Sequence, residues 1–147
     1  MTAWNGLAGG VCWTCFHGSL DAKGWQSDVD HLASLVDTGL EHIAILMVVS
    51  QSESPTAPQR KQIADFMQRN AEALRKVKAN AMVMDSAMAR GALTALSWLF
   101  KKPFEEKVFS TFDAALDWLV QKDAGVVPAA LRADLSLRVP ADQLVLP

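Results

Sequence analysis

The chain has 147 residues, of which 50% are apolar and 20% are charged. This length favours a single domain with a real hydrophobic core, and the composition is that of a folded globular protein rather than a disordered one. The formal net charge of −2 does not indicate nucleic-acid binding. The longest apolar run, residues 43–49, is too short to cross a bilayer. Because the first residues contain neither a basic region nor the apolar core of a signal peptide, we expect a cytoplasmic protein.

Two strands and a helix are predicted first along the chain. Residues 2–4 and 10–17 are expected to form strands joined by Asn5-Gly6, a strong signal for a tight turn, with Gly9-Gly10 adding conformational freedom. The helix is expected to begin near Asp21 and to end at Gly39. Its buried face is predicted from apolar residues at three- and four-residue spacing: Trp25, Val29, Leu32 and Val36.

A central strand and a long helix are predicted next. Residues 40–49 are almost all apolar, which is typical of a strand buried on both faces of a sheet. Residues 50–58 are rich in serine, threonine and proline and are therefore expected to form a loop at the C-terminal end of that strand. The longest helix is predicted from about residue 57 to residue 78. One face of it is traced by Ile63, Phe66, Met67, Asn70, Leu74 and Val77.

Residues 80–119 alternate between strand signals and helix signals. Strands are predicted at residues 81–84 and 107–110, and a helix at residues 86–100 is closed by a proline at position 103. Thr111 is the expected N-cap of the following helix. The core face of that helix is predicted to consist of Phe112, Ala115, Leu116 and Leu119. Such alternation is typical of an α/β fold, in which helices cover a parallel or mixed sheet.

The domain organisation is predicted to be simple. Residues 1–122 are expected to form the α/β domain. Residues 123–147 contain three prolines among apolar residues, and we interpret them as a C-terminal extension that packs on the domain or on a partner subunit.

Cys12 and Cys15 form a C-x-x-C motif, but its context favours structural thiols. In redox proteins the first cysteine of such a motif lies at a helix N-terminus, whereas here the flanking residues predict a strand. Residues three apart on a strand face opposite sides and lie about 10 Å apart, beyond the reach of a disulfide. His17 is near enough in sequence to suggest zinc, but a second pair of ligands is missing. Redox or metal chemistry remains the alternative.

Several motifs give the chain a resemblance to a known family. They are Phe16-His17-Gly18-Ser19-Leu20-Asp21, Gln59-Arg60-Lys61, Arg90-Gly91-Ala92-Leu93-Thr94-Ala95 with Trp98-Leu99, Val108-Phe109, and Ala115-Leu116-Asp117-Trp118-Leu119. With the order of elements, they resemble the STAS-like fold of anti-sigma-factor antagonists, and more specifically its uncharacterised bacterial branch described as stage II sporulation protein AA-like. The resemblance covers about residues 2–122. It implies a mixed sheet of about five strands in the order ββαβαβαβα, about four helices and a C-terminal extension.

The resemblance also indicates where a phosphate would be placed. In phosphorylated members of the wider fold, a serine in an Asp-Ser-Ser-Gly turn starts the helix after the third strand. The corresponding place here is residues 50–55, where that pattern is absent but Ser52 and Ser54 are candidates for phosphorylation. The alternative is that these serines cap the helix. Asp85-Ser86 comes one strand later, and Ser86 is interpreted as a helix cap.

A candidate ligand- or partner-binding edge combines this loop with two arginines. Its residues are Ser50, Ser52, Ser54, Arg60, Arg90 and Gly91. An arginine near a helix start could hold an anion, and both loops are expected at the C-terminal edge of the sheet, where open α/β folds bind ligands. The alternative is that Arg90 is salt-bridged and Gly91 allows close helix packing.

The sequence therefore favours a binding module over an enzyme. His31 and His42 stand alone, and no catalytic, metal or cofactor motif is complete. The first hypothesis is a non-enzymatic regulatory or protein-binding module whose partner is another protein or a second copy in a homodimer. The alternative is a small-molecule or lipid-binding protein in which Arg60 or Arg90 holds an acidic head group.

Overall fold

The computed structural model describes residues 2–18, 21–36, 41–50, 56–87, 90–91, 94 and 102–142. Within these ranges the side chains of Thr2, Trp25 and Val36 are not described. The predicted helix end at Gly39 and most of the predicted helix at residues 86–100 lie outside the described residues. Helical backbone is described there at residues 87, 90, 91 and 94.

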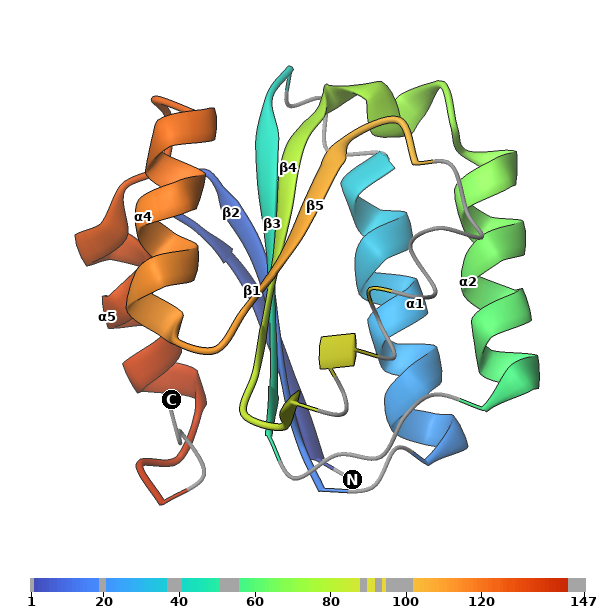
Figure 1. Ribbon diagram of the computed structural model, residues 1–147, viewed down its shortest axis with the longest axis horizontal. Helices are drawn as coiled ribbons and strands as arrows, with labels where there is room; N and C mark the ends of the chain where they lie inside the picture. Colours follow the sequence, from blue (N-terminus) through green and yellow to red (C-terminus); the bar gives the residue numbers. More distant parts are fainter. Residues whose placement is uncertain are drawn as a thin grey trace.

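A five-stranded mixed sheet forms the centre of the molecule, with strand order β1-β2-β3-β4-β5 (Figure 1). The strands are β1 (Thr2–Ala8), β2 (Val11–His17), β3 (Ile43–Ser50), β4 (Val77–Met84) and β5 (Glu105–Phe109). Strand β1 is antiparallel to β2, and the other neighbouring pairs are parallel. Strand β3 pairs on both sides, so its prediction as the central strand is confirmed.

Helices cover both faces of this sheet and make a three-layer molecule. The described helices are α1 (Ala22–Val36), α2 (Ala57–Arg69), α4 (Phe112–Lys122) and α5 (Pro128–Arg138). Figure 1 shows the sheet nearly edge-on, with α1 and α2 on its right and α4 and α5 on its left. The predicted α/β class with about five strands and four helices is confirmed.

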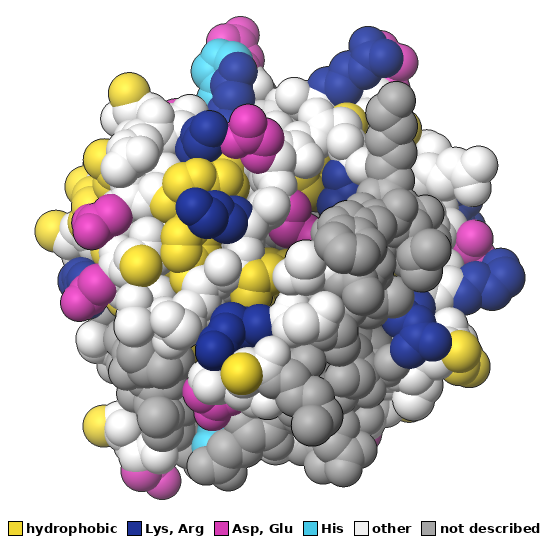
Figure 2. Space-filling view, in the orientation of Figure 1, with side chains coloured by type: hydrophobic (Ala, Val, Ile, Leu, Met, Phe, Trp, Pro, Cys, Tyr) yellow, Lys and Arg dark blue, Asp and Glu magenta, His cyan; other side chains and the backbone are white. Residues whose placement is uncertain are grey.

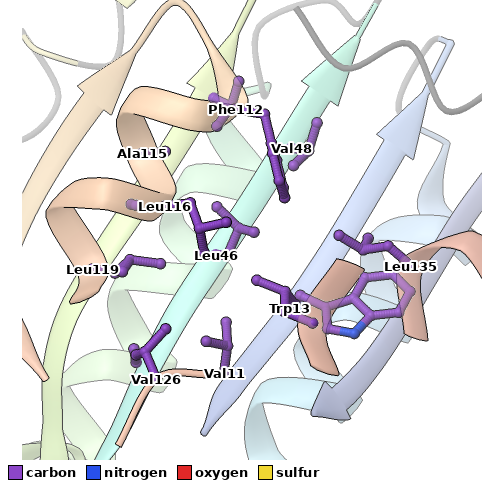
Figure 3. Packing of buried hydrophobic residues seen from close by; sticks show 14 of the residues in the cluster. Val11, Trp13, Leu46, Val48, Phe112, Ala115, Leu116, Leu119, Val126 and Leu135 are labelled. Atoms are coloured by element: carbon purple, nitrogen blue, oxygen red, sulfur yellow. The ribbon is translucent and has the colours of Figure 1, made fainter. Parts of the chain in front are cut away.

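The alternation of side chains along the strands builds a separate core on each face. On the α4–α5 face, Trp13, Leu46 and Val48 pack against residues of these helices that include Phe112 and Leu135 (Figure 3). On the α1–α2 face, a second cluster contains Cys12, Leu32, Leu35, Ile43, Ile45, Phe66, Leu74 and Val77. Because neighbouring residues of a strand point to opposite faces, apolar runs such as β3 serve both cores at once.

The sequence predicted a turn between the first two strands at Asn5-Gly6, and this prediction is wrong. Both residues lie inside β1, where Asn5 is paired with Thr14 and Gly6 with Trp13. The chain turns instead at Gly9 and Gly10, whose φ angles of 57° and 75° lie in the left-handed region that glycine adopts without strain. Two consecutive residues with positive φ are what a tight hairpin turn requires.

The long helix predicted for residues 57–78 is also shorter in the structure. Helix α2 ends at Arg69, a short 3-10 helix follows at Ala73–Lys76, and β4 already begins at Val77. Asn70 ends α2, because its backbone N–H and its side-chain amide both donate to the carbonyl of Phe66, at 3.1 and 2.9 Å. Leu74 and Val77 are buried as predicted, but from outside the helix.

Other predicted boundaries differ by a few residues. Strands β3, β4 and β5 were predicted at residues 40–49, 81–84 and 107–110, and the pairing register extends or shifts each of them. Thr111 does cap α4, since its hydroxyl accepts from the N–H of Ala114 at 3.3 Å. The predicted core face of α4 is buried in full.

Helix α1 buries a face that only partly matches its prediction. Leu32 is buried and Val29 is half-buried, whereas Asp28 and Leu35 are buried without having been predicted. The predicted contacts of the Trp25 and Val36 side chains lie outside the described residues.

The segment after α4 returns across the sheet and completes the α4–α5 core. Val126, Leu131, Leu135 and Val139 are all buried in that cluster. The backbone N–H of Val127 donates to the carbonyl of Gly9 at 2.8 Å, which joins the start of α5 to the β1–β2 turn. Residues of the C-terminal extension therefore belong to the same core as the sheet.

Candidate functional site

One edge of the sheet gathers most of the residues that the sequence identified as functional. Strands β2 to β5 are parallel, so their C-terminal ends meet at this edge, and α1, α2 and α4 begin there (lower edge in Figure 1). Ser50 ends β3, Arg60 lies in the first turn of α2, and Arg90 follows β4. The topology thus brings these three positions to one edge, as predicted for an open α/β sheet.

Ser50 is a buried strand residue rather than part of a loop. Its side chain lies 3.0 Å from Nδ1 of His17 at the end of β2, and its hydroxyl donates a longer hydrogen bond, 3.4 Å, to the carbonyl of Phe16. The backbone N–H of Gly18 donates to the Ser50 carbonyl at 3.2 Å. Gly18 has a φ of 86°, which a residue with a side chain rarely adopts. These contacts join the ends of β2 and β3.

The guanidinium of Arg90 is held by the end of β4. Its Nη1 donates to the carbonyls of Met84 and Asp85, at 2.8 and 3.2 Å. A charged donor on carbonyls at a strand end stabilises the turn that follows it. Gly91 is exposed, and among the described residues nothing lies within 4 Å of where its Cβ would be.

The start of α2 is closed by Thr56, which the sequence analysis did not identify. The Thr56 hydroxyl accepts from the N–H of Gln59 at 3.4 Å, and the Gln59 side chain accepts from the N–H of Thr56 at 2.8 Å. This reciprocal pair is a capping box, and the Thr-x-x-Gln spacing in the sequence could have predicted it. Ser52 and Ser54, the two candidates for phosphorylation, lie outside the described residues.

The starts of α1 and α4 at this edge are also capped. The Asp21 carboxylate accepts from the N–H of Gly24 at 2.7 Å, and this hydrogen bond lowers the pKa of the exposed Asp21 side chain. Thr111 caps α4 in the same manner. Each of α1, α2 and α4 therefore has a side chain of its own on one of its free N–H groups, and an added anion at these helices would have to use the remaining ones.

The two cysteines face opposite sides of β2, as the strand prediction required. Cys12 belongs to the α1–α2 core and Cys15 to the α4–α5 core. Burial raises the pKa of each thiol to about 12, so both thiols are protonated at neutral pH. Within the described parts of the chain, no group of three histidine, cysteine or acidic side chains could hold a metal ion.

His31 was judged to stand alone in the sequence but has a partner in the structure. Its Nε2 lies 3.0 Å from Sγ of Cys12, under helix α1. Desolvation is the main reason that the pKa of His31 is lowered. Asp28 lies one turn earlier on the same helix and is 1% exposed. Its position four residues before Leu32 could have placed it on the buried face from sequence alone.

A cluster of aromatic rings and cations lies on α4 and the neighbouring edge strand β5. The rings of Phe109 and Trp118 are 5.5 Å apart, Lys107 lies over Phe109, and Lys122 lies over Trp118. Figure 2 shows the molecule from the side of β5, and basic side chains lie on hydrophobic surface there. Phe109 and Trp118 come from two motifs of the family resemblance, and the structure shows that these motifs contact each other.

The comparisons with known proteins agree with this architecture. The family model described as SpoIIAA-like matches residues 12–120, which is well over half of the chain. The chain therefore belongs to the SpoIIAA-like family, as its motifs indicated. Among solved structures, an uncharacterised DUF3478-family protein with a SpoIIAA-like fold from Shewanella loihica PV-4 is similar. Its TM-score is 0.57 and its identity 18%, over 74% of this chain and 83% of that chain. A comparison with curated proteins gave no match.

That structural likeness concerns the fold alone. The described helices include none that is long and apolar enough to span a membrane. Strand β1 and the whole segment after α4 lie outside residues 12–120.

Proposed function

We propose that this chain is a non-enzymatic protein-binding module of the STAS-like kind, and that it acts in the cytoplasm. Its partner docks on the C-terminal edge of β2, β3 and β4. The partner is another protein, or a second copy of the chain.

The observation that carries this proposal is that polar side chains at that edge are hydrogen-bonded to the ends of the strands. The Ser50 hydroxyl is hydrogen-bonded to the end of β2, and the Arg90 guanidinium is hydrogen-bonded to the end of β4. A serine nucleophile would need a base and access to substrate, but Ser50 is 3% exposed. These groups fix the shape of the edge, which suits a preformed surface that a partner recognises.

Site-specific crosslinking tests the position of the partner. A photo-crosslinking amino acid at Asp85, which is exposed at this edge, is expected to capture a defined partner in the host cell. The same amino acid at Ala124, exposed between α4 and α5 at the opposite end, is the matched control. Equal capture at both positions, or none at Asp85, would contradict the proposal.

Binding measured with the purified partner completes the test. The variant Asp85→Arg is expected to weaken binding about tenfold or more, since a reversed charge opposes a complementary surface. Ala124→Arg introduces the same side chain at the opposite end and is expected to leave binding unchanged. Mass spectrometry of protein isolated from its own host would show whether Ser52 or Ser54 carries a phosphate.

The alternative function, holding a small acidic or lipid ligand with Arg60 or Arg90, stays a prediction. Arg90 already donates to two carbonyls, so an acidic group would have to share its remaining donors. Native mass spectrometry of the same host-purified protein would detect such a ligand as a bound mass.

A further inference from the structure

Asp28 is a deeply buried carboxyl at the middle of helix α1, and no described residue gives it a positively charged partner. It is 1% exposed, and no described side chain or backbone group meets the distance and angle of a full hydrogen bond to either of its oxygens. The Thr14 hydroxyl on β2 is near enough to favour the charged form, although its geometry falls short of a hydrogen bond. Burying an unpaired carboxylate costs several kcal/mol unless the group takes up a proton, on the order of the penalties known for buried ions.

Glu106, a half-buried carboxyl on β5, has a different environment. Glu106 of β5 accepts from Lys102 at 2.5 Å and from the side-chain amide of Asn80 at 2.7 Å. Its negative charge is therefore neutralised and hydrogen-bonded. Among the described residues Asp28 has no cation beside it and only the weak support of Thr14, although it is more completely buried.

The groups that face Asp28 do not supply a positive charge. Strand β2 contributes Thr14 and the Cys12 thiol. The pKa of Cys12 is raised mainly by desolvation and further by the charge of Asp28. Helix α1 itself contributes His31, whose pKa is lowered mainly by desolvation, so its ring is neutral at pH 7. Arg138 of α5 acts on His31 rather than on Asp28. Helix α1 also packs against β1 and α2, and among the described residues of these two elements none contributes a charge that acts on this carboxyl.

We propose that the contact between α1 and the sheet is a latch controlled by one proton. Helix α1 is held most firmly when the Asp28 carboxyl is protonated, and ionisation of that carboxyl loosens the helix from β2. Cys12, which the Asp28 charge reaches, contacts His31, and neither group supplies a positive charge that would compensate the ionised carboxyl at neutral pH. The latch concerns α1 and the sheet of the chain alone and does not depend on a binding partner.

The direction of the pH effect follows from the buried environment. Desolvation raises the pKa of Asp28 from 3.8 to about 6. A carboxyl whose pKa is higher in the folded state stabilises that state fully below the unfolded pKa. This contribution is lost as the pH rises from about 4 through about 6. The packing of helix α1 on the sheet is therefore expected to be least stable at neutral and alkaline pH.

Hydrogen exchange of the full chain measures this directly. After correction for intrinsic rates, the protection of α1 amides relative to α4 amides is expected to fall about tenfold between pH 5 and pH 8. Most of that change should occur below pH 7. The variant Asp28→Asn is expected to remove this dependence and to keep α1 protected at pH 8.

Asp30→Asn is the matched control, because Asp30 is an exposed carboxyl two residues along the same helix. It should retain the pH dependence of the unmodified protein. A carbon-13 titration of the Asp28 carboxyl in that protein provides a second measurement that needs no variant. Titration near pH 4, equal loss of protection in α1 and α4, or an unchanged slope in Asp28→Asn would each overturn the latch.

Discussion

Gly6 is the residue whose role differs most between sequence and structure. A Cβ at this position would lie 2.9 Å from two ring carbons of Trp13 and 2.6 Å from Oδ2 of Asp134. The indole Nε1 of Trp13 donates to that same oxygen at 2.9 Å. A glycine is needed here because the fully buried indole lies against the backbone of β1, where it reaches Asp134 and donates its hydrogen bond.

Adding one methyl group at Gly6 should therefore destabilise the fold. We expect Gly6→Ala to lower the free energy of unfolding by about 1–3 kcal/mol, because the buried ring of Trp13 has little room to move. Gly91→Ala is the matched control, since Gly91 has helical backbone and is exposed. It should raise stability by about 0.5–1 kcal/mol. Urea unfolding measures both, and equal stabilities for the two variants would contradict this account.

At the scale of elements, α5 is a helix that the apolar pattern of the sequence did not predict. Leu131 and Leu135 are 0% and 1% exposed, whereas Leu137 on the same helix is 85% exposed. Helix α5 packs against β1 and covers a part of the sheet that α4 does not reach. The division into a domain at residues 1–122 and an extension at residues 123–147 remains a prediction. It is tested by measuring how much α5 contributes to the stability of the fold.

Two substitutions on α5 measure this contribution. Leu135→Ala is expected to cost about 2–5 kcal/mol of unfolding free energy, since it leaves a cavity against Trp13 and its neighbours. Leu137→Ala removes the same atoms from the exposed face and should change stability by less than about 0.5 kcal/mol. Urea unfolding followed by tryptophan fluorescence compares them. A small loss for Leu135→Ala would show that α5 is only loosely attached.

The secondary structure illustrates where sequence patterns succeed. The apolar run of β3 and the spacing of the α4 core residues predicted these elements well, because burial on a regular strand or helix has a fixed period. The end of α2 could not be located in this way. Leu74 and Val77 continue the helical spacing, yet Asn70 ends the helix by bonding back to Phe66.

At the scale of the whole molecule, the sheet separates two cores that share the same strands. Cys12 lies in one core and Cys15 in the other, three residues apart on β2. Each thiol is thus covered by a different pair of helices, with a pKa of about 12 caused mainly by desolvation. The two thiols can report separately on the opening of the two layers.

Thiol labelling is expected to follow this separation. In the native protein at pH 8, neither cysteine should react with iodoacetamide within minutes, because both are buried and protonated. In concentrated urea both should react at the rate of an unperturbed thiol. Peptide mass spectrometry distinguishes the two sites. Rapid labelling of either cysteine in the native state would show that its layer is open.

The candidate site was only partly predictable. The sequence placed Ser50, Arg60 and Arg90 at one edge because parallel strands end together. It could not show that Ser50 bonds to His17, which is 33 residues away, or that Arg90 holds the end of β4. The Thr56 cap was readable from its spacing to Gln59, because both partners are local.

The sequence by itself determined the class of the fold, the central position of β3, the face of α4 and the membership of the family. These features depend on the periodic burial of neighbouring residues and on short motifs, which are local. Only the tertiary structure decided that the chain turns at Gly9 and Gly10, that Trp13 meets Asp134, and that Cys12 meets His31. Such contacts join distant segments, and their geometry depends on how the layers pack rather than on any one stretch of the chain.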